Sequence, residues 1–304
     1  MKTGGYIIVL FFFSGFVWSQ NSLERFLTPS DTLNKSRLHT LLISEAAIGG
    51  ATLIGLNQIW YADYPRSNFH FINDNDEWLQ MDKMGHLFSA YHLGSYGAQA
   101  LKWSGADKKS QMIYGSTLGL AFLTAVEVFD GYSANWGASP GDVIANVSGT
   151  ALYVSQELLW NEQRIIPKFS FHTTSYAKER PEVLGSSLSE QLLKDYNGQT
   201  YWLSANIHSF AKQSKIPKWL NVAVGYGAEG MITGTKGDFD VVNSFPERER
   251  YRQFYLSLDV DLTKIETKSH FLKTILTVFN SVKIPAPAFE INGLGGSKLH
   301  FIYF

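Results

Sequence analysis

The apolar residues of the chain follow two different spacings, one in its first half and another in its second. From about residue 36 to residue 164 they recur every three or four positions, which is the period of an α-helix that buries one face. This spacing predicts four helices, at residues 38–61, 83–103, 109–129 and 142–161. The fourth follows Ser139-Pro140-Gly141-Asp142, a typical helix start, and we expect Asp142 to cap it by accepting hydrogen bonds from backbone amides.

From about residue 169 onward the pattern mostly alternates, as it does in a strand with one buried face. The clearest run, at residues 254–262, places Leu256 and Leu258 on the face that we expect to be buried. Ser257, Asp259 and Asp261 lie on the opposite face, which we expect to be solvated. Weaker runs predict further strands at residues 168–172, 201–209, 220–227, 288–292 and 298–304, and a short amphipathic helix at 270–282.

Together these patterns predict an α+β fold, with a compact helical bundle rich in small residues over residues 20–165 and a small antiparallel β region over residues 166–304. Small residues four positions apart, as in Gly115-x-x-x-Gly119 and Ala145-x-x-x-Gly149, allow helices to approach closely. The charge-free helical stretches are shorter than the roughly 20 residues that cross a bilayer. Such lengths fit a buried core helix or a re-entrant segment. We expect the bundle to lie at a membrane or partly in it, and a fully soluble bundle is the alternative.

The first 19 residues have the parts of a secretory signal peptide. Lys2 supplies a positive start, residues 6–17 are apolar, and Val17-Trp18-Ser19 provides a context for cleavage. This segment predicts export to the periplasm or outer membrane of a Gram-negative bacterium. The sequence contains no cysteine, which excludes a lipidated cysteine, a disulfide and thiolate chemistry. Attachment to a membrane is therefore expected to come from the fold.

Charge and aromatic content narrow the class of partner. The net charge is -1 at pH 7 and no basic stripe is visible, so we expect no nucleic-acid partner. Aromatic residues are abundant, with 15 Tyr, 21 Phe and 8 Trp, and some of them end apolar segments, as Trp103 and Trp160 do. Amphipathic rings at such ends suit a membrane–water interface, and they equally suit an aromatic-rich core. The expected partner is a membrane lipid or another envelope component, and the sequence leaves the oligomeric state open.

Ionisable residues are scarce in the helical region, and those that stand out form three pairs. The pairs are Asp82 with His86, Glu127 with Asp130, and Asp142 with Asn146. The members of each pair are three or four positions apart, so they project from one face of a helix or helix end. If the three helices converge, an imidazole and up to four carboxylates share a small space, and their buried charge needs compensation. Lys83 is the nearest counter-ion, and a divalent metal ion is the other solution.

Three interpretations of this cluster are open. In the first, the side chains hydrogen-bond one another and only fix how the helices pack. In the second, His86, Glu127 and Asp130 supply mixed nitrogen and oxygen ligands for a divalent metal ion such as Zn²⁺ or Mn²⁺, the one cofactor that the sequence suggests. In the third, His86 is a general base or nucleophile that Asp82 or Glu127 orients. Lys83 then binds an anionic headgroup or phosphate.

The same residues resemble those of two known families. Asp82-Lys83-Met84-Gly85-His86, followed by Glu127, Ser139-Pro140-Gly141-Asp142, Asn146 and Gly149, resembles the uncharacterised YfiM-type periplasmic lipoproteins. The order is also similar to that of VanZ-like membrane proteins, which share an Asp-Lys-x-x-His start, a helical Glu and a closing Asp-x-x-x-Asn-x-x-Gly. The resemblance covers residues 82–160 and implies an envelope location. VanZ-like proteins are associated with glycopeptide resistance, but neither family supplies a settled reaction or a substrate.

We therefore expect an exported, membrane-associated protein of the cell envelope with a structural or lipid-interacting role. The alternative is an envelope hydrolase or transferase that acts on a lipid or cell-wall headgroup through the histidine and carboxylate site. The two differ in an observable way. A structural network should be closed to solvent and fully hydrogen-bonded, whereas an enzyme should have a pocket that reaches His86.

Overall fold

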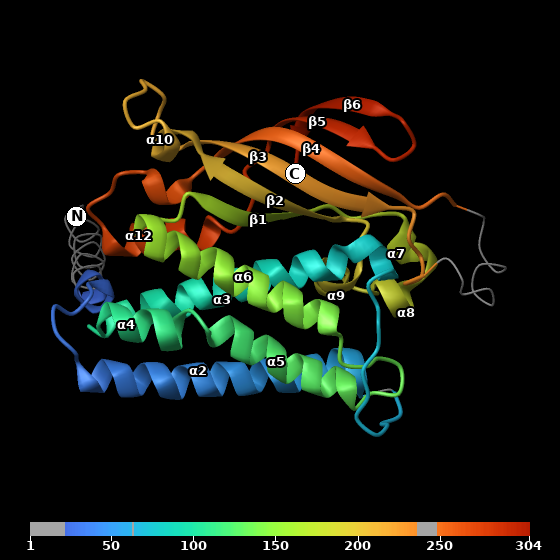
Figure 1. The fold of residues 1–304 in the computed structure, drawn as a ribbon, viewed down its shortest axis with the longest axis horizontal. Coiled ribbons are helices and arrows are strands. Elements are labelled where there is room, and N and C mark those ends of the chain that lie inside the picture. The colour runs from blue at the N-terminus through green and yellow to red at the C-terminus, as the bar shows by residue number, and fades with distance from the viewer. Residues whose placement is uncertain (1–21, 63, 236–247) are drawn as a thin grey trace, which may run out of the picture.

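The computed structural model describes residues 22–62, 64–235 and 248–304, and the predicted signal peptide at residues 1–19 lies outside them. A layer of helices is followed by a sheet, so the predicted α+β class is confirmed (Figure 1). The long helices are α2 (Lys35–Leu56), α3 (Met81–Trp103), α5 (Leu118–Gly131) and α6 (Pro140–Trp160), and each overlaps one of the four predicted helices. Short helical turns adjoin them at η1 (Asn57–Tyr61), η2 (Glu77–Gln80), α4 (Lys108–Ser110) and η3 (Gln111–Gly115).

The first turn of α6 is capped by a different residue from the one we expected. Ser139 has an extended backbone (φ -99°, ψ 117°), and its hydroxyl oxygen accepts a hydrogen bond from the backbone N–H of Asp142. Pro140 follows at the first helical position, where its fixed φ suits the helix. The cap is therefore Ser139, because a cap side chain lies outside the helix and reaches the amide three residues on. The carboxylate of Asp142 is left to make contacts between helices.

Glycines bring α3 into contact with the backbones of α5 and α6. A Cβ atom at Gly119 of α5 would lie 2.4 Å from the carbonyl oxygen of Ala90. A Cβ atom at Gly149 of α6 would lie 2.2 Å from the carbonyl oxygen of Leu87. Any larger residue would force these backbones apart. The close approach allows short side chains at the start of α6 to reach the start of α3.

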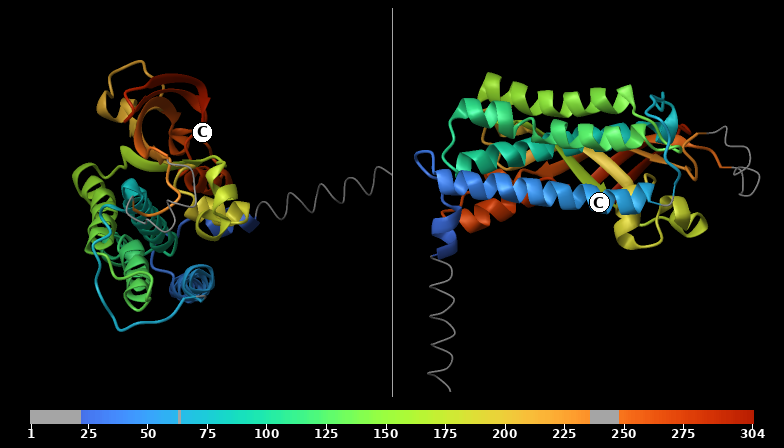
Figure 2. Two further views of the ribbon diagram at one scale, coloured as in Figure 1. Left: turned by 90° about the vertical axis from the view of Figure 1, so that its right-hand side faces the viewer. Right: turned by 90° about the horizontal axis from the view of Figure 1, so that it is seen from below.

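Within the described residues, six strands form one antiparallel sheet in the order in which they occur along the chain. The strands are β1 (Ile165–Phe171), β2 (Gln199–Asn206), β3 (Leu220–Glu229), β4 (Tyr251–Val260), β5 (Ala286–Asn292) and β6 (Ser297–Tyr303). The connecting segments contain α7 (Tyr176–Glu179), α8 (Pro181–Leu184), α9 (Leu188–Lys194), α10 (Ile207–Phe210), η4 (Leu262–Lys264) and α12 (His270–Phe279). The sheet is strongly curled, as Figure 2 shows. Each predicted strand corresponds to one of these six strands.

The sheet buries polar residues and exposes apolar ones, which reverses the orientation that we expected for β4. Asp259 and Asp261 are 2% and 0% exposed, whereas Leu256 and Leu258 are 53% and 50% exposed. The carboxylate of Asp259 lies 2.8 Å from the ammonium of Lys168, which is also fully buried. The expectation was wrong because alternation separates the two faces of a strand without indicating which one is covered. A buried carboxylate is tolerated where a buried cation meets it.

Apolar contacts join the sheet to the helical layer beside the start of α3. Met81, the first residue of α3, is fully buried and belongs to one cluster with Tyr201 of β2. The ring of Phe88, two turns further along α3, packs 5.9 Å from that of Tyr201. On the opposite face of β2, Trp202 packs against Tyr255 of β4 inside the curl of the sheet. The first cluster holds the start of α3 against β2.

The turn before α3 is strained, and the sheet holds it in place. Trp78, Leu79 and Gln80 have φ values of 46°, 50° and 64°, in the left-handed region that costs energy for residues other than glycine. Tyr226 of β3 donates a hydrogen bond to the carbonyl oxygen of Leu79, and Arg252 of β4 donates one to the side-chain oxygen of Gln80. The sheet thereby helps to fix where α3 begins.

Candidate functional site

The candidate site lies where the ends of three helices meet. The residues predicted for it are Asp82, Lys83 and His86 of α3, Glu127 and Asp130 of α5, and Asp142 and Asn146 of α6. Contacts between Lys83 and Asp142, and between His86 and Glu127, connect all three helices. The structure therefore brings together residues that lie up to 64 positions apart in the sequence, counted from 82 to 146.

Lys83 is surrounded by three carboxylates. Its ammonium lies 2.7 Å from Oδ2 of Asp74, 2.9 Å from Oδ2 of Asp82 and 2.9 Å from Oδ1 of Asp142. Although burial opposes its charge, these carboxylates raise the pKa of Lys83 above its usual value. Lys83 therefore acts as a protonated counter-ion. This arrangement favours a role inside the network over the binding of an anionic headgroup.

Asp74 is a member of the network that sequence reasoning missed. Its Oδ1 accepts a hydrogen bond of 2.5 Å from the hydroxyl of Ser139, in addition to the ion pair with Lys83. Burial would raise the pKa of Asp74, but the hydrogen bonds from Lys83 and Ser139 lower it overall. The residue precedes η2 in a loop, where no helical spacing marks it. The polar run of residues 73–76 is the one signal that could have drawn attention to it.

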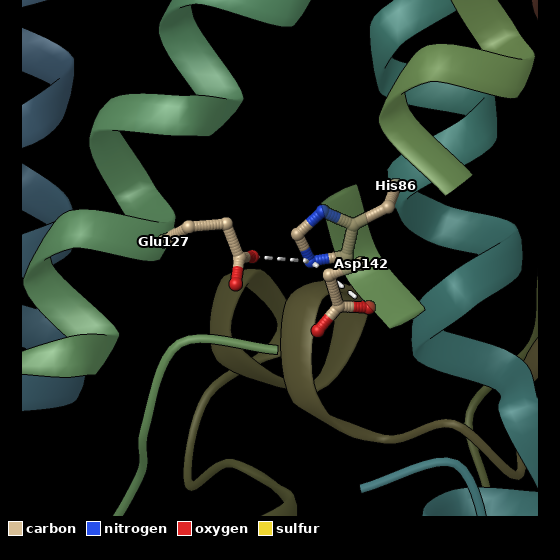
Figure 3. A group of neighbouring side chains, drawn as sticks. All are labelled: His86, Glu127 and Asp142. Carbon is tan, nitrogen blue, oxygen red and sulfur yellow. Dashed lines mark ion pairs between the residues drawn. The ribbon is translucent and has the colours of Figure 1, made fainter. Parts of the chain in front are cut away.

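The imidazole of His86 faces two carboxylates and an amide. Its Nδ1 lies 3.0 Å from Oδ1 of Asn146, and its Nε2 lies 3.9 Å from both Oε1 of Glu127 and Oδ1 of Asp142. Figure 3 shows both carboxylates directed toward the ring. With the amide oriented in this way, and its nitrogen without a hydrogen-bond partner among the described residues, Nδ1 carries the proton in the neutral ring. The lone pair of Nε2 then points between Glu127 and Asp142.

Glu127 is buried, and only one of its two carboxylate oxygens has a hydrogen-bond partner among the described residues. Its Oε2 accepts a hydrogen bond of 2.9 Å from the backbone N–H of Ser139. Its Oε1 has no hydrogen-bond partner within the described residues. Burial raises the pKa of Glu127 to about 8, opposed by the hydrogen bond from Ser139 and assisted by the charge of Asp142. The network is therefore not fully hydrogen-bonded, and an unpaired buried oxygen is costly unless a ligand meets it.

Residues 70–157 match the model of a family described as "Predicted periplasmic lipoprotein (DUF2279)". The matched segment contains Asp74 and all seven predicted site residues, and it ends before β1. The match supports an exported protein of the periplasm or cell envelope, as the N-terminal segment and the YfiM-type resemblance predict. Neither a comparison with curated proteins nor one with solved structures gives a match.

Asp130 lies within the family segment but makes a separate contact. It accepts a hydrogen bond of 2.7 Å from the hydroxyl of Tyr61 in η1. Burial raises its pKa to about 6, and the hydrogen bond from Tyr61 opposes that shift. Three positions along a helix correspond to a rotation that turns Asp130 partly away from Glu127. The atoms that lie within 4.8 Å of one another are those of His86, Glu127 and Asp142, so Asp142 takes the place that we expected for Asp130.

A cleft of about 190 Å³ opens beside the site, between η1 and the end of α5. Tyr61 lines this cleft and joins it to the site through its hydrogen bond with Asp130. His86 does not line it, although the histidine side chain is 19% exposed. The site therefore has one feature of a ligand site, the unpaired oxygen of Glu127, beside a cleft whose lining does not include His86.

Proposed function

We propose that this exported protein is a membrane-associated component of the cell envelope that contacts lipid acyl chains through the outer face of its sheet. The observation behind the proposal is a row of large apolar side chains that the strand register places side by side. Its members are Leu203, Val224, Leu256, Phe289 and Leu299, on β2 to β6 in turn. They are between 37% and 60% exposed. We call these five residues the apolar row.

The apolar row does not stand alone on its face. A second line in register joins Tyr226, Phe254 and Ile291, and the latter two are also about half exposed. Contiguous apolar patches of this kind are uncommon on proteins that are surrounded by water, and they mark surfaces that meet a membrane or another protein. The buried polar face supports contact with a membrane, because the sheet has its charged groups inside and its apolar groups outside.

Helix α2 presents a second uncovered apolar surface. Residues Lys35–Tyr61 form a helical segment that is long and apolar enough to cross a membrane by length and composition. None of the residues of α2 is buried. Ile43, Ile48 and Ile54 are each about two-thirds exposed. A helix that is apolar and yet unburied is stable where apolar material surrounds it.

The positions of the two surfaces favour lipid over a folded partner. Figures 1 and 2 place α2 on the side of the helical layer that faces away from the sheet. One folded partner of ordinary size would cover a single side of the molecule. Acyl chains around a partly embedded protein would meet both sides. We also propose that the protein is related to the YfiM-type and VanZ-like proteins that its motif resembles. We further propose that it lies at the outer membrane.

The second candidate is an envelope hydrolase or transferase that acts on a lipid or cell-wall headgroup. The specific observation in its favour is the unpaired, buried Oε1 of Glu127, because a network that only fixed the helices would be fully paired. In that case Nε2 of His86, which faces Glu127 and Asp142, would be the base. We rank this candidate second because the cleft is lined by Tyr61 and not by His86.

Lipid contact can be tested with a single introduced cysteine, because the native sequence contains none. We would attach an environment-sensitive fluorophore to Leu256→Cys and reconstitute the protein into phosphatidylethanolamine–phosphatidylglycerol vesicles with brominated acyl chains. The matched control is Gln213→Cys, an exposed polar position in the loop before β3. We expect bromine quenching at residue 256 and little at residue 213. Equal quenching at both positions, or cross-linking between copies at 256 without quenching, would overturn the proposal.

A further inference from the structure

We propose that His86, Glu127 and Asp142 bind one divalent transition-metal ion, Zn²⁺ or Mn²⁺, a role that goes beyond membrane association. Each residue offers one ligand atom, and the three atoms lie within 4.8 Å of one another. They come from three helices, α3, α5 and α6, whose close packing holds the ends together. An imidazole nitrogen with two carboxylate oxygens is a donor set that suits these metals, whereas Mg²⁺ and Ca²⁺ prefer oxygen alone.

The imidazole of His86 is oriented as a metal ligand usually is. Its Nδ1–H donates to Oδ1 of Asn146, at 3.0 Å, and this contact directs the lone pair of Nε2 toward the two carboxylates. Metal-binding histidines almost always donate their second ring nitrogen to such an acceptor, which fixes the tautomer and the angle of the ring. Asn146 is completely buried, so its amide is held in place by the packing of α6. Asn146 is therefore a positioning residue for this site.

The carboxylate of Glu127 provides the independent sign of a ligand. Its side chain is only 5% exposed, and its Oε2 is satisfied by the backbone N–H of Ser139. Its Oε1 has no hydrogen-bond partner within the described part of the chain and points toward Nε2 of His86 (Figure 3). Their separation of 3.9 Å is too long for a hydrogen bond. This buried carboxylate oxygen lacks a partner, and a bound cation would be one.

The site shares Asp142 with a neighbouring acidic group, because Oδ1 of Asp142 faces Nε2 of His86 and also lies 2.9 Å from the ammonium of Lys83. Asp74, Asp82 and Asp142 also bring their oxygens within 4.8 Å of one another, but the ammonium of Lys83 already lies among them. Among the described residues, Lys83 makes ion pairs with Asp74, Asp82 and Asp142 but not with Glu127, so the carboxyl group of Glu127 has no lysine or arginine beside it. The carboxyl group that lacks a lysine partner is therefore the one that faces the imidazole.

The distances are compatible with a small ion after a slight adjustment. Ligand atoms about 2.1 Å from a tetrahedral Zn²⁺ lie roughly 3.4 Å apart. The two distances of 3.9 Å from Nε2 of His86 would have to shorten by about half an ångström. The side chains of Glu127 and Asp142 would have to rotate toward the imidazole to make this change. Water would complete the coordination.

The test is a titration of the full chain, purified in detergent and stripped of metal with EDTA, with ZnCl₂ and separately with MnCl₂. Isothermal calorimetry should give one ion per chain for the wild type. We expect His86→Gln and Glu127→Gln to bind at least ~100-fold more weakly, and Asn146→Ala to lose ~10–100-fold through the misplaced imidazole. Asp130→Asn is the matched control, because it removes a neighbouring carboxylate outside the group, and it should bind within about threefold of the wild type.

Two further measurements keep the result interpretable. Circular dichroism establishes that each variant is folded, and the visible spectrum of bound Co²⁺ should change in His86→Gln and not in Asp130→Asn. No stoichiometric binding by the folded wild type would overturn the proposal, and so would unchanged affinity in both folded ligand variants. Vesicle contact at residue 256 is measured independently, so failure of the metal site would leave the lipid proposal intact.

Discussion

Gly149 of α6 lies directly against Leu87 of α3, so closely that a Cβ atom on the glycine would be 2.2 Å from the leucine carbonyl oxygen. Leu87 follows His86, and Gly149 lies three residues beyond Asn146. The contact therefore sets the distance at which the amide of Asn146 reaches the imidazole. A backbone oxygen cannot move aside as a flexible side chain can, so the crossing depends on the absence of a side chain.

Gly149→Ala should therefore force α6 away from α3. We expect a loss of roughly 1–3 kcal/mol in the free energy of unfolding, measured by thermal denaturation in detergent, because overpacked contacts shift backbones. Gly49→Ala is the matched control, since no described atom lies within 4 Å of a Cβ there. In α2 the same change should be neutral or stabilise by up to ~1 kcal/mol through helix propensity. Equal effects at the two positions would contradict the close crossing.

The buried pair of Lys168 and Asp259 should be costly to break from one side. Lys168→Met leaves the carboxylate inside the sheet with one hydrogen bond each from Ser204 and Ile284, and with Lys283 at 3.9 Å. We expect a loss of ~3 kcal/mol in the free energy of unfolding, since the buried carboxylate loses its closest cation and keeps only the more distant Lys283.

The double variant Lys168→Met/Asp259→Leu removes this pair of charges but leaves Lys283 buried without its carboxylate, so it should recover only part of that loss. A double-mutant cycle, with each variant followed by chemical denaturation, gives the coupling between the two side chains. Strictly additive losses would mean that the two groups do not compensate each other. Lys218→Met, which breaks an exposed ion pair with Glu266, is the control and should change stability by less than ~1 kcal/mol.

Stability should fall as the pH decreases from about 6.5 toward 4, and His92 is one cause. Burial lowers the pKa of His92 to about 4, and Nε2 donates to the carbonyl oxygen of Pro167 at 2.7 Å. In this pH window the unfolded chain binds a proton at His92 that the folded chain does not. The unfolded state is therefore favoured by up to ~1.4 kcal/mol per pH unit for this group.

His92→Gln removes the titrating ring and keeps a donor, so its stability should depend less on pH across that window. Denaturation at pH 7, 6, 5 and 4 would compare the slopes of the wild type and the variant. His39→Gln, on the exposed surface of α2, should keep the slope of the wild type. A variant slope equal to that of the wild type would mean that His92 takes up its proton in the folded state as well.

Sequence reasoning predicted the helices and strands because each leaves a period in the chain. The helix predicted at 83–103 is observed at Met81–Trp103, and the strand predicted at 220–227 is observed at Leu220–Glu229. Of the site, it predicted the residues that stand at helical spacing, such as Asp82 with His86. Which of their carboxylates would meet the imidazole depends on rotation about each helix axis, and a single sequence does not determine that rotation.

Three features escaped prediction for physical reasons. Asp74 lies in a loop, where no period singles it out, although its carboxylate binds Lys83 as closely as those of the helices do. The start of α6 contains both a serine and an aspartate with capping ability, and the serine caps it. The orientation of β4 could not be read from alternation, because the pattern is the same whether water or lipid surrounds the molecule.

The last prediction concerns the apolar row, and it tests whether these side chains contact lipid or contribute to the core of the protein. Leu256→Gln/Phe289→Gln replaces two half-exposed neighbours on β4 and β5. Because both already face outward, the loss in the free energy of unfolding in detergent should stay within ~1 kcal/mol, whereas two buried residues would cost several. Flotation with phosphatidylethanolamine–phosphatidylglycerol vesicles should nevertheless decrease severalfold. Undiminished flotation of the folded variant would show that lipid does not contact this face. Lys212→Gln/Gln213→Ser, in an exposed polar loop, controls for handling and should float like the wild type.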